Sequence, residues 1–67
     1  MPSNRVSSAA ACAIASARAA DAVTMWIDKL SEEERGAVRK RLAERQEWAA
    51  LETWDARVTQ WCFGKLP

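Results

Sequence analysis

The 67-residue chain is about half apolar, and its ten Lys and Arg against nine Asp and Glu give a formal charge of +1. A charge so close to zero is not the electrostatic footprint of a protein that binds nucleic acid or an anionic membrane. The chain has no histidine and two cysteines, Cys12 and Cys62, which excludes four-ligand zinc spacings and leaves no visible metal or cofactor site.

The composition predicts one all-α domain over residues 1–67. Only Gly36 and Gly64 are glycines, and both prolines lie at the chain ends, so little punctuates an alanine-rich sequence into strands. We expect an antiparallel two-helix hairpin, with one helix over about 5–30 and a second over about 32–63. A chain of this length is marginally stable alone and often gains stability from a disulfide or a second subunit.

The N-terminal segment is similar to a secretory signal, because Arg5 precedes an apolar run that ends in Ala15-Ser16-Ala17. The run is mostly alanine with a single Ile14, however, which favours an ordinary helix. Arg18 and Asp21 interrupt the only candidate for a membrane span. We therefore expect a bacterial-type cytoplasmic protein with reduced thiols and no membrane partner.

The first helix is expected to start at Ser3 or Asn4, either of which can cap it. Its predicted apolar face is small near the N-terminus and bulky near the turn, where Trp26 is expected to pack into the core. The face comprises Ala9, Cys12, Ala13, Ala19, Ala20, Val23, Trp26, Ile27 and Leu30. Ile14 and Met25 fall on the opposite, polar side.

The second helix begins with a capping box, in which the Ser31 hydroxyl accepts from the Glu34 backbone while the Glu34 carboxylate reaches back. Glutamates in the first turn also suit the positive end of the helix dipole. The turn is thus predicted at residues 30–31. Gly64 is expected to end the helix, and Gly36 to allow a close approach.

Two apolar stripes run along the second helix. One comprises Val38, Leu42, Ala49 and Ala56, and the other comprises Leu51, Trp54, Val58, Trp61 and Cys62. A single hairpin partner covers one stripe. We therefore predict a homodimer in a four-helix arrangement, with Leu51, Trp54, Val58 and Trp61 at its interface. Two alternatives remain open: a break near 46–50 that lets the C-terminal piece fold back, or a stripe left exposed.

The same hairpin geometry tests a disulfide between the two cysteines. In a turn centred at 30–31, Cys12 lies beside residues near 49, so Cys62 is roughly 19 Å further along the second helix. A bridge needs Cα atoms within about 7 Å. The prediction is that no Cys12–Cys62 bridge forms unless the second helix breaks.

The sequence contains few candidate catalytic residues, because histidine, tyrosine and a glycine-rich phosphate loop are all missing. The carboxylates of Glu44 and Glu47 lie one helical turn apart but among basic residues, which indicates a solvated ionic face. We expect a protein that is not an enzyme and takes no small-molecule substrate.

A basic cluster lies on the second helix: Arg35, Arg39, Lys40, Arg41 and Arg45. These residues spread over more than half of the circumference and are interleaved with glutamates, whereas a phosphate backbone requires a one-sided stripe. An ionic face is favoured. The alternative is a small DNA-binding transcriptional regulator or antitoxin-like module that uses this cluster.

Trp48 lies to the side of both stripes, near charged residues of both signs. Tryptophan and arginine are the residues most enriched at interface hot spots. We therefore predict a partner-binding site made of Arg41, Arg45, Trp48 and Glu52. The leading hypothesis is a non-enzymatic inhibitor or adaptor, and a purely structural assembly subunit is a further alternative.

The Leu30-Ser31-Glu32-Glu33-Glu34-Arg35 turn, the Ala- and Arg-rich composition and the tryptophan-bearing second helix span most of the chain. With these features the chain resembles the small helical-hairpin proteins that bacteriophages make to disable host factors, such as quorum-sensing anti-activators and anti-defence inhibitors. The resemblance implies an antiparallel homodimer that occludes a host transcription activator or a motor ATPase.

Overall fold

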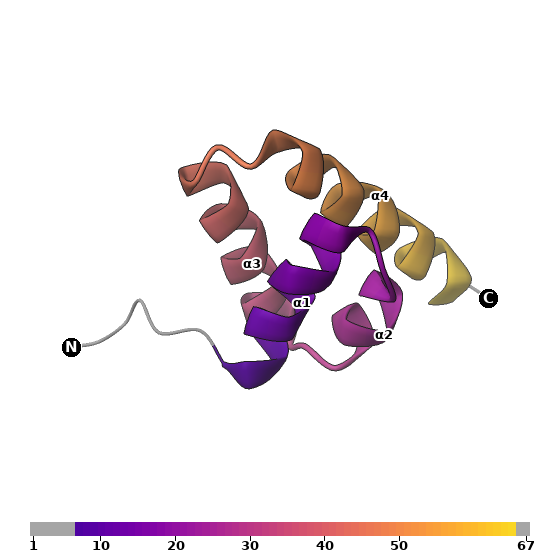
Figure 1. Ribbon diagram of the computed structural model, residues 1–67. Helices are drawn as coiled ribbons and strands as arrows, with labels where there is room; N and C mark the ends of the chain where they lie inside the picture. Colours follow the sequence, from indigo (N-terminus) through magenta and orange to yellow (C-terminus); the bar gives the residue numbers. More distant parts are fainter. Residues whose placement is uncertain (1–6, 66–67) are drawn as a thin grey trace.

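The computed structural model describes residues 7–65 and contains four helices in this range (Figure 1). They are α1 (Ser8–Ala19), α2 (Val23–Asp28), α3 (Glu32–Glu44) and α4 (Trp48–Lys65). The all-helical prediction is confirmed for these residues. The two long helices are not: each is divided into two, at residues 20–22 and 45–47.

The first division is a Schellman motif built on alanine. Ala20 takes a left-handed conformation with φ 55°, its N–H donates to the Ala17 carbonyl at 3.3 Å, and the Asp21 N–H donates to the Ser16 carbonyl at 2.9 Å. Ala22 is also left-handed, with φ 45°, and α2 begins after it without a side-chain cap. The left-handed region disfavours residues with a Cβ, so the sequence contained no signal for this corner.

The second division repeats the motif at Gln46, which has φ 56°. The Gln46 N–H donates to the Ala43 carbonyl at 3.0 Å, and the Glu47 N–H donates to the Leu42 carbonyl at 2.9 Å. This is the break near 46–50 that the sequence left open as an alternative. It lets α4 turn back along α3.

The turn at residues 30–31 and its capping box are confirmed. Glu34 N–H donates to Ser31 Oγ at 3.1 Å, and Ser31 N–H donates to Glu34 Oε1 at 3.0 Å. Ser7 caps α1 by accepting from the Ala10 N–H at 3.1 Å. The predicted caps Ser3 and Asn4 lie outside the described residues.

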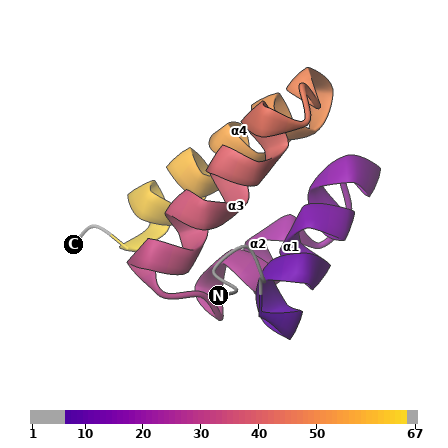
Figure 2. The ribbon, with the colours of Figure 1, turned by 90° about the vertical axis from the view of Figure 1, so that its left-hand side faces the viewer.

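The four helices enclose one small core. In Figure 2, α3 and α4 lie side by side and antiparallel, and α1 and α2 lie to the right of this pair. Helix α1 packs against the other three. The buried residues are Ala10, Ala13, Ile14, Ala17, Val23, Ile27, Leu30, Val38, Leu42, Ala50, Leu51 and Trp54.

The helix breaks change which faces are buried. Ile14, expected on the polar side of the first helix, is buried because the shortened α1 packs against α3 and α4 as well as α2. Ala49 and Ala56, expected to continue the stripe of Val38 and Leu42, are exposed because α4 starts in a new orientation after Gln46. Trp26 is half-buried, with the Lys29 ammonium 5.2 Å from its ring centroid.

Neither glycine takes its predicted role among the described residues. Gly64 is the penultimate residue of α4, which runs to Lys65, and no atom beyond the adjoining residues and backbone of its own helix lies within 4 Å of a Cβ placed on Gly36. The two cysteines are free thiols, with Cys12 half-buried and Cys62 exposed, although the helix does break. Among residues 7–65 no helix is long and apolar enough to cross a bilayer.

Candidate protein-binding surface

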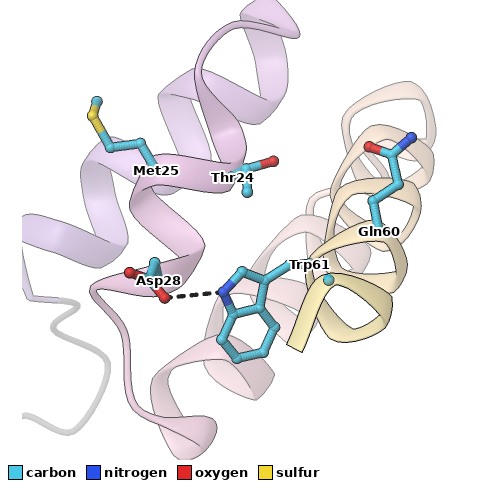
Figure 3. Close-up of a pocket in the computed structure, with 6 residues that line it drawn as sticks. Thr24, Met25, Asp28, Gln60 and Trp61 are labelled. Atoms are coloured by element: carbon cyan, nitrogen blue, oxygen red, sulfur yellow. Dashed lines mark hydrogen bonds between the residues drawn. The ribbon is translucent and has the colours of Figure 1, made fainter. Parts of the chain in front are cut away.

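A groove lies between α2 and the C-terminal half of α4 (Figure 3). It has a volume of about 490 Å³ and is lined by Thr24, Met25, Asp28, Gln60, Trp61 and Gly64. Gly64 contributes no side chain to the wall of the groove, and the Met25 side chain, which lines the groove, is 51% exposed. The groove therefore presents apolar surface to solvent at the end of the molecule furthest from Trp48 on α4.

Trp61, which lines this groove, has the Arg35 guanidinium over its ring and a hydrogen bond to Asp28, and we call these three side chains the stack. The Trp61 Nε1–H donates to Asp28 Oδ1 at 3.0 Å, and the Arg35 guanidinium lies 4.4 Å from the Trp61 ring centroid (Figure 3 draws the hydrogen bond). Arg35 Nη1 also donates to the Leu30 carbonyl at 2.6 Å. Arg35 thus satisfies a carbonyl in the turn that follows α2 while it lies over the indole, so the stack joins α2, α3 and α4.

A second hollow of about 480 Å³ lies at the α3–α4 corner, where Trp48 and Glu47 line it together with Arg18 of α1. Arg18 and Glu47 form a bidentate ion pair with N–O distances of 2.6 and 2.7 Å. The hydrogen bonds from Arg18 hold the pKa of Glu47 below its usual value. This pair ties the end of α1 to the corner from which Trp48 projects.

The predicted partner-binding residues lie around this corner. Trp48 is 60% exposed, and Glu52 follows it one turn along α4, also exposed. Arg45 is exposed at the end of α3, and Arg41, half-buried one turn earlier, has interactions within the chain. Trp48 and Glu52 share one face of α4, whereas Arg41 belongs to α3 and Arg45 is the C-cap of that helix. Their role in binding stays a prediction.

The residues predicted for the dimer interface take part in the chain's own core instead. Leu51 and Trp54 are buried, with Trp54 only 2% exposed. Val58 and Trp61 are half-buried against the same core. The premise for that interface was a stripe that one neighbour could not cover. Here α1 and α2 cover it, because both predicted helices break.

The opposite side of α4 is exposed, and we call it the outer face. It comprises Trp48, Glu52, Ala56, Thr59 and Phe63, which recur at intervals of three or four residues. Phe63, at 69%, is the most exposed large hydrophobic residue of those described. The prediction of binding residues omitted Phe63 and Met25, although the position of Met25 on the polar side of the first helix was a usable signal.

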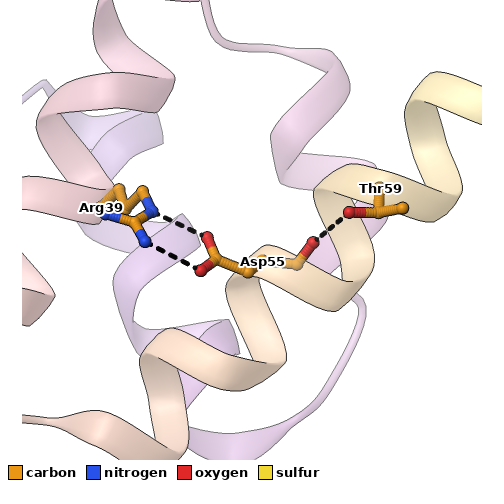
Figure 4. Close-up of polar contacts among 3 residues, drawn as sticks. All are labelled: Arg39, Asp55 and Thr59. Carbon is orange, nitrogen blue, oxygen red and sulfur yellow. Dashed lines mark hydrogen bonds and ion pairs between the residues drawn. The ribbon is translucent and has the colours of Figure 1, made fainter.

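The basic cluster does not form a stripe. Arg35 is committed to the stack, and Arg39 pairs with Asp55 of α4 through two hydrogen bonds of 3.0 and 3.2 Å (Figure 4). The Thr59 hydroxyl donates to the Asp55 carbonyl at 2.9 Å on the same helix. At least two of the five cations are thus engaged by groups of the chain itself, which weakens the DNA-binding alternative.

Comparisons with known proteins return no match: no family model, no curated protein and no solved structure aligns significantly with the chain.

Proposed function

We propose that this chain is a non-enzymatic protein-binding inhibitor or regulator that covers a surface of another protein, with Trp48 as its principal contact. The observation that carries the proposal is the 60% exposure of Trp48 at the start of a helix whose next tryptophan, Trp54, is buried. A bulky indole held in water at a rigid corner gains free energy when a partner removes it from solvent.

The surroundings of Trp48 indicate the chemistry of the partner surface. Arg45 and Glu52 are exposed on either side of the corner, and the Arg18–Glu47 pair fixes its base. A complementary protein surface has an apolar pocket for the indole with charged groups of both signs at its rim. A host transcription activator or motor ATPase with such a pocket is the class of target that we propose, following the resemblance to phage inhibitors.

A capture experiment tests this proposal. Tagged protein is incubated with bacterial lysate, and bound proteins are identified by mass for the parent chain, for Trp48→Ala and for Met25→Ala. We expect one captured protein whose affinity falls about 30-fold with Trp48→Ala, equivalent to a hot spot of about 2 kcal/mol. Met25→Ala removes an exposed apolar side chain from the other candidate surface, the groove between α2 and α4, and should retain the target if the corner at Trp48 is the surface that binds.

Two results would overturn the proposal. In the first, no captured protein depends on Trp48. In the second, the chain retains nucleic acid whose binding falls by orders of magnitude between low and moderate salt, which is the signature of phosphate contacts.

A further inference from the structure

The outer face of α4 has an approximate internal symmetry. Trp48 and Phe63 lie at equal distances from the midpoint between Asp55 and Ala56, at about 11 Å on each side for a rise of ~1.5 Å per residue. Glu52 and Thr59 lie at equal distances nearer the centre. Read in either direction, the face is aromatic, polar, small, polar and aromatic.

We propose that two copies of the chain pair through this outer face, with the two α4 helices antiparallel about a two-fold axis beside Ala56. A two-fold interface uses the same patch on both copies, so the patch must complement itself when reversed. Here Trp48 meets the partner's Phe63, and Phe63 meets the partner's Trp48. The small Ala56 at the axis allows the helices to approach within the usual ~8–10 Å.

The charges on this face are compatible with such pairing. Glu52 faces the partner's Thr59, so no like charges oppose each other at that level. Asp55 lies close to the axis and would approach the partner's Asp55. Each of these carboxylates is already neutralised by the bidentate contact with Arg39 of its own chain (Figure 4).

The available area sets the strength of the pair. Trp48 and Phe63 are 60% and 69% exposed. Since a fully buried aromatic residue removes about 150–250 Å² from water, these two offer roughly 250 Å² per chain. A stable standard interface buries about 800 Å² per partner, so this one belongs to the smaller, transient class. We expect a dissociation constant in the micromolar range or higher, so that the dimer coexists with free chain.

The pairing has one consequence that rests on the proposed function. Since Trp48 is covered in the dimer, self-association and target capture compete for the same side chain. Free chain is then the form that binds the target.

Sedimentation equilibrium over about 1 μM to 1 mM tests the pairing without any target. The parent chain should show a reversible monomer–dimer equilibrium. Phe63→Ala should raise the dissociation constant of the dimer at least tenfold, because in a two-fold dimer one substitution removes two equivalent contacts. Ala56→Glu should abolish it. The matched control Ala37→Glu adds the same charge at an exposed alanine of α3 and should leave the equilibrium unchanged. Circular dichroism checks that each variant is folded.

A cysteine experiment tests the axis itself. In a background of Cys12→Ala and Cys62→Ser, Ala56→Cys places two symmetry-related thiols on opposite sides of the proposed axis and close to it, within the ~7 Å Cα separation that a disulfide allows. Mild oxidation should link this variant into covalent dimers much faster than Ala37→Cys.

The proposal is overturned if the parent chain stays monomeric to 1 mM. It is also overturned if dimers form but Ala56→Cys links no faster than the control. A chain that dimerises as described but captures no target would leave the pairing intact and refute the proposed function, so the two failures are distinguishable.

Discussion

Trp54 and Trp48 lie on the same helix, six residues apart, and have opposite fates. Trp54 is 2% exposed on the inner face of α4, and Trp48 is 60% exposed on its outer face. The two residues share an identity and a helix, so intrinsic preference cannot separate them. They differ in their position around the helix axis, because the inner face packs against α1 and α2 while the outer face is exposed to solvent. The direction of a tryptophan, set by the helix breaks at residues 20–22 and 45–47, decides whether it stabilises the fold or is available to a partner.

The largest test of this contrast is alanine substitution of the two indoles. Trp54→Ala should destabilise the chain by about 3–5 kcal/mol, because it removes the largest fully buried side chain from a small core and leaves a cavity. Such a loss unfolds most domains of this size. Trp48→Ala should change the free energy of unfolding by no more than about 0.5 kcal/mol. Urea unfolding followed by circular dichroism measures both, and comparable losses would contradict the contrast.

The second test concerns Trp61, which lies between the two faces. Arg35→Ala removes both the cation over the indole and the donor to the Leu30 carbonyl, and should cost about 2 kcal/mol. Trp61→Phe keeps a ring but removes the hydrogen bond to Asp28, and should cost about 1 kcal/mol. The same unfolding assay applies. If Arg35→Ala cost no more than an exposed Lys40→Ala, the stack would have no structural role.

The third test acts on the corner that lets α1 and α2 cover the inner face. Ala20 has φ 55°, where glycine is favoured over alanine, so Ala20→Gly should raise the free energy of unfolding by about 1 kcal/mol. The matched control Ala15→Gly lies in the middle of α1, at an exposed position, and should lower it by about 0.5–1 kcal/mol. Thermal melts in which Ala20→Gly raises the stability and Ala15→Gly lowers it would confirm the left-handed corner. Equal losses of stability in the two variants would show a continuous helix through Ala20.

The smallest expected effect is a pH dependence at the corner beside Trp48. Arg18 holds the pKa of Glu47 below its unfolded value, so the stabilisation is present above the unfolded pKa of about 4.5 and is lost as pH falls through the folded pKa. Parent and Glu47→Gln melts should therefore differ at pH 6 and converge toward pH 3. The exposed pair is screened by salt, which makes the difference small. Melts that diverge on acidification would contradict the assigned direction.

Local signals in the sequence predicted local structure well. The capping box at Ser31 and Glu34 depends on a four-residue pattern, and it is present as predicted. Val38 and Leu42 are fully buried, as their spacing one turn apart indicates. These features depend on near neighbours, whose effects a short window of sequence contains.

The breaks were not predictable in the same way. Ala20 and Gln46 adopt left-handed conformations that their own preferences oppose, while Gly36 and Gly64, the two glycines of the sequence, lie within α3 and α4. The burial of Leu51 and Trp54 against α1 and α2 outweighs the local cost. The two apolar stripes on the second helix indicate that two different surfaces must pack against it. The sequence does not show that other helices of the same chain provide both surfaces. The residues predicted for the dimer interface therefore lie on the inner face of α4, against α1 and α2.

The bare start of α2 has a consequence for the motions of the molecule. This helix has six residues, and Ala22 before it offers no side chain to receive its first amide protons. It is therefore the segment of least intrinsic helicity, held mainly by Val23 and Ile27 and by the bond between Asp28 and Trp61. Deuterium should enter its amides by local opening while α3 remains protected. The groove beside Met25 would then widen and narrow with that opening, even in a molecule that is otherwise folded.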